Sequence, residues 1–187
     1  DNQFWQQEVY LSMVNKVQLF SWWDVAVSAD YQWNALDATL ANFAYPERNT
    51  GLLAFATAFH YRWIRLQASV LGTFVEDKAR EGAIRSQANH WTPAVFLSAR
   101  PLLQEQWFIR LFYKDIFRLP TFNDLYYTDV GNIHLEPEYA RQYDAGMEYT
   151  KTLNAQRATL NLKLKADAYF NQIRNKIVAV PKGNSQY

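Results

Sequence analysis

Three histidines and a pair of glutamates are the side chains with the clearest capacity for chemistry. His60, His90 and His134 are each isolated in the sequence, whereas metal sites use ligands at close and regular spacing. Glu136 and Glu138 flank a proline, but general acid–base catalysis needs two groups that converge on one substrate. No nucleophile elbow, phosphate-binding loop or dinucleotide fingerprint is present. The sequence therefore predicts neither an enzyme, nor a metal site, nor a bound cofactor.

Composition narrows the class of protein further. The 187 residues are 49% hydrophobic and 17% aromatic, carry a formal net charge of +1 and include no cysteine. The length suffices for one domain with a sizeable core, and the many amphipathic rings suggest contact with a large apolar surface. The small net charge gives no reason to expect a nucleic-acid partner. Disulfides and thiolate metal sites are excluded.

Long segments of alternating hydrophobicity indicate β-strands. In Asp24–Ala35 and Arg157–Phe170 apolar residues recur at nearly every second position, a period that decides for strand over helix. Eight strands are predicted, at Gln7–Leu19, Asp24–Ala35, Gly51–His60, Ile64–Phe74, Ala94–Arg100, Gln106–Lys114, Tyr139–Tyr149 and Arg157–Phe170. Among them Gly51–His60 is small and apolar on both faces, so the sequence does not orient it. Short and long connections alternate between them, and the long loops are expected at Asp37–Thr50, Glu76–Thr92 and Ile116–Pro137.

Strand length and connection pattern favour a barrel that spans a membrane. Strands in soluble sheets usually have about 5 or 6 residues, whereas a strand that crosses a bilayer needs about 9 to 11. Short turns at one end and long loops at the other are typical of outer-membrane barrels. A soluble barrel of the lipocalin kind is the alternative, because alternation alone does not say which face is inside.

Aromatic and charged residues decide between these two barrels. Rings cluster at the short-turn ends, as an interfacial belt would: Trp22, Trp23, Tyr61, Trp63, Trp107 and Tyr149. The polar face is too charged for a dry core, since each buried ion carries a large desolvation cost: Asp24, Asp30, Arg65, Arg110, Lys114, Asp144, Glu148, Lys163, Lys165 and Asp167. The predicted fold class is all-β, an antiparallel up-and-down transmembrane β-barrel, with about eight strands of a larger barrel present. On this assignment Leu162 faces lipid at mid-membrane.

The loop after the sixth predicted strand has the most specific composition. Leu119-Pro120 should hold the chain extended, and Gly131-Asn132 suits a turn that needs positive φ. Pro137 lacks an N–H group and fits where the next strand begins. Arg118 could fix the loop by pairing with Asp124 or with Glu138. These residues therefore shape a loop, although direct contact with a ligand is the alternative.

The order of residues in this stretch resembles the C-terminal barrel of TonB-dependent outer-membrane receptors. The matching residues are Arg118, Pro120, Asp124, Leu125, Tyr126, Gly131, Asn132, Leu135, Pro137, Glu138 and Gly146. Two departures from the commonest family pattern occur, at Ile133-His134 and at Glu136. They caution against transferring any ligand preference from the family.

The resemblance implies a place in the bacterial outer membrane, in contact with its lipid. It implies a larger barrel that encloses an N-terminal plug domain, and a TonB-type energy-transducing partner reached through an N-terminal region. Residues 1–187 would then be a partial barrel without its plug. The implied activity is uptake of a scarce nutrient of the siderophore, haem, vitamin B12 or oligosaccharide class.

Ligand contact and completeness of the barrel stay open at this point. His90, Tyr127 and His134 fall in or beside the predicted outer loops, where they could contact a ligand or simply be solvated. Both termini look like internal points of a longer sequence. The alternative is a complete small barrel of eight strands, whose interior side chains can fill, with a structural or adhesive role.

Overall fold

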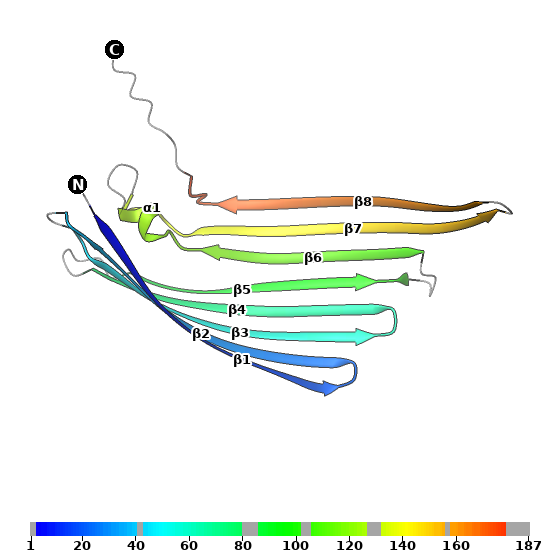
Figure 1. The fold of residues 1–187 in the computed structure, drawn as a ribbon, viewed down its shortest axis with the longest axis horizontal. Coiled ribbons are helices and arrows are strands. Elements are labelled where there is room, and N and C mark those ends of the chain that lie inside the picture. The colour runs from blue at the N-terminus through cyan, green and yellow to red at the C-terminus, as the bar shows by residue number, and fades with distance from the viewer. Residues whose placement is uncertain are drawn as a thin grey trace, which may run out of the picture.

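Eight antiparallel strands form one sheet, in which each strand pairs with its neighbours in the chain (Figure 1). This computed structural model describes residues 3–40, 43–79, 86–101, 106–126, 132–155 and 158–178. The strands are β1 (Phe4–Phe20), β2 (Trp23–Ala38), β3 (Pro46–Tyr61), β4 (Ile64–Ala79), β5 (Ser86–Ala99), β6 (Trp107–Arg118), β7 (Glu138–Ala155) and β8 (Ala158–Arg174). A short helix, α1 (Phe122–Tyr126), lies between β6 and β7. The predicted all-β, up-and-down architecture is confirmed.

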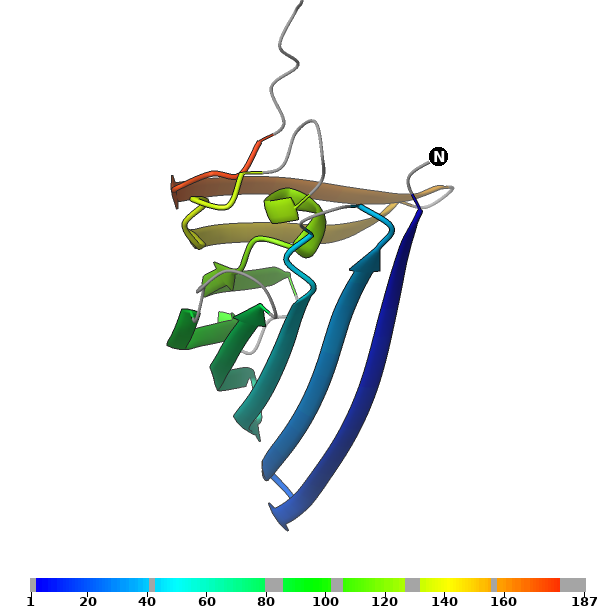
Figure 2. The ribbon, with the colours of Figure 1, turned by 90° about the vertical axis from the view of Figure 1, so that its left-hand side faces the viewer.

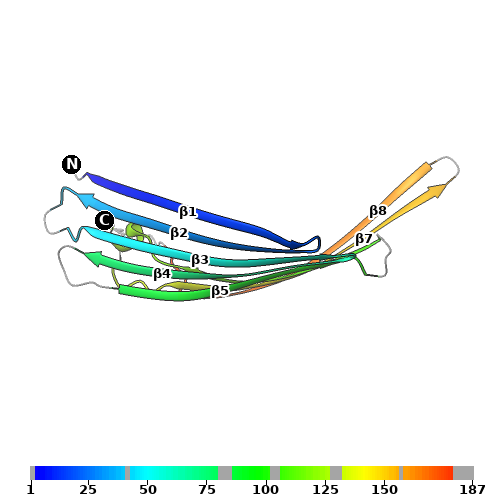
Figure 3. The ribbon, with the colours of Figure 1, turned by 90° about the horizontal axis from the view of Figure 1, so that it is seen from below.

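The sheet is open and curved. Figures 2 and 3 show the strands bending around one concave side, with α1 inside the curve. Among the described residues β1 and β8 form the two edges and do not pair with each other, so the eight strands do not make a closed barrel. No helix within the described ranges is long and apolar enough to cross a membrane.

The strands are longer than predicted, between 12 and 18 residues. The loop expected at Asp37–Thr50 is shortened at both ends, because β2 continues to Ala38 and β3 begins at Pro46. Likewise, much of the loop expected at Glu76–Thr92 belongs to β4 and β5. Backbone pairing continues there although polar residues now occur on both faces, so the regular alternation that marks a strand disappears before the strand does.

Register places the apolar side chains on the convex face. One cross-strand row runs through Leu66, Leu97, Leu111, Ala145 and Ala168. Partners in register share a face of a sheet, so each such row is uniform in orientation. Trp23 belongs to this row through Phe59, and Leu36, on the opposite face of β2, packs with α1 inside the curve. The apolar row therefore lies on the convex face, which is the reverse of a soluble barrel with an apolar interior.

The charged side chains predicted for a wet lumen share the concave face and pair across strands. Lys16 lies 3.4 Å from Asp24, and Glu148 accepts from both Lys163, at 2.6 Å, and Lys165, at 3.3 Å. Exposed pairs of this kind each contribute about 0–1 kcal/mol. Their shared position on the concave face therefore indicates that this face meets water, and the pairs themselves add little to stability.

Aromatic belts border the apolar convex face at both ends. At the short-turn end Trp22 and Trp23 stack with ring centroids 6.1 Å apart, and Trp107 lies 4.7 Å from Tyr149. At the long-loop end Tyr113 lies 5.0 Å from Tyr143. Between the belts β4 runs from Ile64 to Phe74, which at about 3.3 Å per residue and a tilt of about 40° gives a band of roughly 25 Å. That height matches the hydrocarbon layer around a membrane barrel.

The β7–β8 hairpin extends beyond the ends of the other strands on the short-turn side (Figure 1). Tyr149 pairs with Leu164, and Leu162 pairs with Lys151 two residues further along the hairpin. The expected place of Leu162 at mid-membrane is therefore wrong. The length of β7 past its last β6 partner, Trp107, moves Leu162 to the border of the band.

The β5–β6 ladder covers only part of both strands. Its last pair toward the long-loop end joins Ala94 to Lys114, although β5 continues back to Ser86 and β6 on to Arg118. Pro93 is the first residue beyond that pair, and proline has no N–H group with which to extend a ladder. The sheet therefore divides between β5 and β6 at this end.

A charge placed on the convex face, where it would meet lipid, should prevent assembly of the full-length protein. We expect Val70→Arg to cost about 2–4 kcal/mol, because Val70 lies between the belts and a barrel charge at mid-bilayer carries this penalty. Gln67→Arg, on the concave face of the same strand, should assemble normally. The measurement is the amount of heat-modifiable, folded protein in the membrane fraction. Equal loss in both variants would contradict the assignment of faces.

Candidate functional site at the long-loop end

A nearly buried arginine clamps the loop after β6 to the wall formed by β3 and β4. Arg48 is only 9% exposed. Its Nε and Nη2 donate to the two carboxylate oxygens of Asp77, each at 2.7 Å, and the two residues are register partners on the concave face. Its Nη1 donates to the Pro120 carbonyl oxygen at 2.7 Å. One guanidinium thus satisfies a bidentate carboxylate and a loop carbonyl together.

Aromatic packing supports the same clamp. Phe122, the first residue of α1, is buried with Leu36, Ala38 and Phe43, and Arg48 lies over its ring at 5.2 Å. This cluster is the main hydrophobic core of the described residues. Because Leu36 and Ala38 belong to the concave side of β2, α1 is held against the inside of the curve (Figure 2).

Helix α1 is short and depends on its cap. The Thr121 hydroxyl accepts from the Asp124 N–H at 3.2 Å, and the Asp124 carboxylate accepts from the Thr121 N–H at 2.8 Å. This reciprocal arrangement is a capping box. Arg118 then lies 3.5 Å from the Asp124 carboxylate. Of the two partners that the sequence offered for Arg118, the structure pairs it with Asp124.

The returning half of the loop is fixed to the end of β8. Glu138 accepts from the Ile177 N–H at 3.0 Å, and Glu136 accepts from Asn175 Nδ2 at 2.8 Å. The two glutamates therefore bind different parts of one segment and do not converge on a common point. Pro137 directly precedes β7, as predicted.

Asn132 and Gly146 have separate local roles. The Asn132 side chain accepts from the His134 N–H at 3.0 Å, which closes a turn. Gly146 faces the concave side, where a Cβ would lie 2.5 Å from Arg110 Nε and 2.5 Å from the Asp167 carboxylate. The absence of a side chain lets Arg110 of β6 reach Asp167 of β8 across β7.

The remaining predicted site residues are scattered. Tyr126 is half-buried in the cluster, where burial raises the pKa of its hydroxyl, reinforced by Asp77 and opposed by Arg48. Leu125 and Leu135 are partly exposed, and His134 is exposed. Tyr127 and Gly131 lie outside the described residues.

The sequence predicted that His90 lies in a loop, but the structure places it in β5. Its ring lies 4.8 Å from that of Phe117 and 5.0 Å from that of Tyr139, inside the division between β5 and β6. Among the described residues no three His, Asp or Glu side chains gather as metal ligands would.

Arg48, Asp77 and Phe122 were missed by the sequence analysis. Arg48 and Asp77 fall in segments that were expected to be loops, and their pairing follows from a register that the sequence does not state. A weak signal existed, because each is a charged residue within a few positions of a predicted strand end.

Fold and site together define a segment of an outer-membrane β-barrel: long tilted strands, two aromatic belts, an apolar convex face and a charged concave face. Comparison with protein families identifies the particular family. Residues 20–187 match the model of the TonB dependent receptor-like β-barrel. The chain belongs to this family, whose members are outer-membrane receptors and transporters of Gram-negative bacteria and not enzymes.

Solved structures agree on the fold. The hemophore receptor HasR of Serratia marcescens, determined as a double mutant with its hemophore HasA and heme, superposes with a TM-score of 0.63 at 10% identity. The copper transporter OprC superposes with a TM-score of 0.61 at 11% identity. Each covers 92% of this chain, which spans only 33% and 34% of their respective lengths. No curated protein sequence matches the chain.

Loss of the clamp should release the loop. We expect Arg48→Leu to destabilise the loop attachment by about 3–5 kcal/mol, because it leaves the Asp77 carboxylate buried without its partner. The measurement is proteolysis within the loop after β6 in the folded, full-length protein. The double variant Arg48→Leu/Asp77→Leu should recover part of the protection. Arg62→Leu, in an exposed turn at the other end, is the control, and cleavage unchanged by Arg48→Leu would contradict the clamp.

A side chain at position 146 should separate Arg110 from Asp167. We expect Gly146→Val to lower the thermal stability of the full-length protein by about 1–3 kcal/mol through overpacking. Ala145→Val, on the convex face one residue away, should have little effect. Adding Arg110→Ala should relieve much of the loss, since it removes two of the three nearest atoms that the new side chain meets. Additive losses would show that this contact is not the cause.

Proposed function

We propose that this chain is part of the barrel wall of an outer-membrane receptor that takes up a scarce nutrient with energy from a TonB-type partner. The observation that supports this best is the clamped loop. Its base is fixed to the concave wall by Arg48 and Phe122, at the end of the sheet that carries the long loops. A loop held in this way gives an outer vestibule a defined inner surface, which capture of a small ligand requires.

The ligand class is proposed from the family and not from a built site. Siderophore, haem, vitamin B12 and oligosaccharide remain the candidates. Of the two predicted contact histidines within the described residues, His134 is the better placed, because it is exposed and its backbone is fixed by Asn132. His90 is engaged by two aromatic rings. Tyr127 stays a proposed contact on its place in the sequence alone.

The concave face offers a surface on which a plug domain could pack. A hollow of about 330 Å³ lies there, with a floor that includes Ala26, Ala56 and Ala58 and aromatic sides formed by Phe96 and Phe112. Small residues let another backbone approach closely. We propose that the plug of the same parent protein occupies this hollow, and that residues 1–187 are a partial barrel whose plug is encoded elsewhere in that protein.

Uptake measurements on the parent protein test the proposed function. Cells that lack the parent gene should fail to accumulate one of four labelled probes: a ferric siderophore, haem, cyanocobalamin or an oligosaccharide. Restoring the gene should restore uptake, and dissipating the proton gradient should abolish it. Unchanged accumulation of every probe would overturn the uptake proposal, and uptake without the gradient would overturn its energy dependence.

Filling the hollow should loosen the plug. We expect Ala56→Trp in the full-length receptor to admit large antibiotics that intact receptors exclude, because an indole in the hollow displaces the packed domain. Phe55→Trp, one residue along on the convex face, is the matched control. Sensitivity to vancomycin is the measurement, with folded receptor levels checked in parallel. Equal resistance in both variants would argue against plug contact at this hollow.

A further inference from the structure

The division between β5 and β6 opens a polar cleft on the convex face. From Ser86 to Pro93, β5 keeps β4 on one side and has no ladder partner in β6 on the other. A cavity of about 290 Å³ lies beside the division and extends over β7 and β8. Its polar lining includes Asp115, Arg141, Gln172 and Arg174.

Register places this cleft just above the apolar band. Asp115, Arg141 and Gln172 form one cross-strand row, and Phe117, Tyr139 and Arg174 form the next row toward the long loops. The row below is Tyr113, Tyr143 and Phe170, which belongs to the aromatic belt. A belt of this kind sits at the level of lipid headgroups. The cleft therefore faces the headgroup layer of the outer leaflet.

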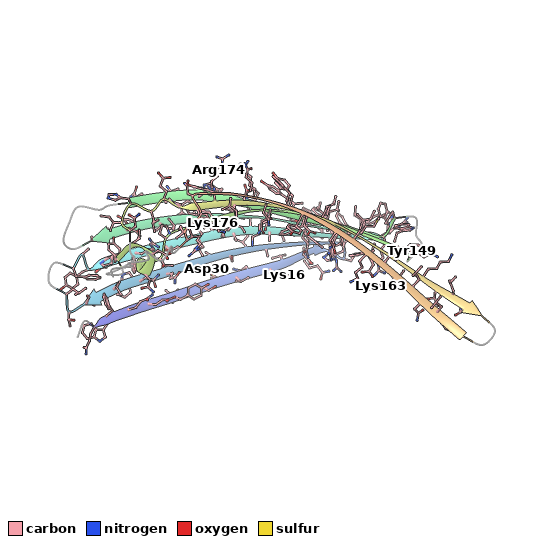
Figure 4. The ribbon with its side chains drawn as sticks, turned by 90° about the horizontal axis from the view of Figure 1, so that it is seen from above. Lys16, Asp30, Tyr149, Lys163, Arg174 and Lys176 are labelled. Atoms are coloured by element: carbon pink, nitrogen blue, oxygen red, sulfur yellow. The ribbon has the colours of Figure 1, made fainter. Side chains whose placement is uncertain are left out.

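The charges in the cleft favour an anion. Arg141 and Arg174 are both exposed, whereas Asp115 is the one carboxylate among the described residues of the lining. That carboxylate is already engaged, since it lies 3.6 Å from Arg141 Nε and accepts from the Tyr113 hydroxyl at 2.8 Å. Among the described residues no carboxylate lies within ion-pair distance of Arg174. Figure 4 shows Arg174 on the long-loop side of the sheet and Tyr149 on the other side.

An apolar groove lies next to the cleft, on the side of the membrane band, because the row Tyr113, Tyr143 and Phe170 that lines it directly neighbours the row that carries Arg141. It has a volume of about 540 Å³ and is lined by Leu97, Leu111, Ala145, Ala168 and Phe170 on the convex face. Tyr113 and Tyr143 border both the groove and the row that carries Arg141. A ligand that fills both spaces must carry an anionic head and an apolar chain.

We propose that the cleft and groove bind one phosphorylated glycolipid of the outer leaflet. Its phosphate lies between the Arg141 and Arg174 guanidinium groups, which suit phosphate geometry. Its acyl chain lies in the groove below. A free anion would use the cleft alone, and an added peptide strand would pair with the open edge of β5 without needing either arginine. A charged cleft directly beside an apolar groove favours the lipid.

Lipid binding to the purified full-length receptor tests this proposal. Delipidated receptor in detergent is titrated with bisphosphorylated lipid A, and bound lipid is counted by native mass spectrometry. We expect Arg141→Gln/Arg174→Gln to weaken binding roughly tenfold or more, since two charge-assisted contacts are lost. Arg174→Gln alone should weaken it less, and this variant removes no ion pair among the described residues. Lys151→Gln, on the convex face at the other end of β7, should bind as the native receptor does.

Three further measurements distinguish binding of the whole lipid from binding of its phosphate or its acyl chain alone. Dephosphorylated lipid A should bind weakly, and inorganic phosphate at millimolar concentration should not displace the lipid. Ala168→Trp, which fills the groove, should also weaken binding. Native affinity in the arginine variants, full displacement by phosphate, or equal binding of the dephosphorylated lipid would each overturn the proposal. Loss of binding in Lys151→Gln would overturn it as well, because the effect would then be non-specific charge.

Discussion

A backbone that crosses lipid must satisfy its own N–H and C=O groups, because hydrocarbon offers them no partner. The ladders from β1 to β8 meet this demand with neighbours that are adjacent in the chain. Once the ladders are fixed, the pleat leaves no freedom in orientation, and each side chain faces either lipid or lumen. The ion pairs of the concave face, the aromatic belts and the position of the Arg48 clamp all follow from that single register.

Backbone pairing between neighbouring strands stops outside the apolar band, where a backbone group no longer needs a strand as its partner. The β5–β6 ladder ends at Ala94, next to a proline, at the level where water and headgroups can replace a strand partner. The loop after β6 likewise leaves the wall above the band and is then secured by side chains instead of a ladder. Arg48 and Asp77 can be buried together there because each completes the other's hydrogen bonds, which compensates the cost of removing two charges from water.

Period-two alternation was enough to predict most of the strands, and the alternating short and long connections predicted their antiparallel order. The charged face and the aromatic clusters then predicted the lipid-facing side, since all of these are visible in the local sequence. Alternation could not predict where the strands end. Outside the membrane band polar residues occur on both faces of β3 and β4, so Arg48 and Asp77 read as loop residues. The loop after β6 was predicted from the sequence, and the Arg118–Asp124 ion pair was one of the two pairings predicted for Arg118. The attachment of this loop to β3 depends on curvature that brings distant strands together, and no local pattern encodes that curvature.

The sheet of β1 to β8 and the clamp made by Arg48 can form at different stages of assembly. Because strand order follows chain order, each hairpin can add to the one before it as the protein assembles, with little loop-closure entropy at any step. The bond from Arg48 to the Pro120 carbonyl instead joins residues 72 positions apart. It can close only after β4, β5 and β6 are in place and curved. Closure of the loop after β6 is thus a late event, and it marks a wall that has been built in the correct register.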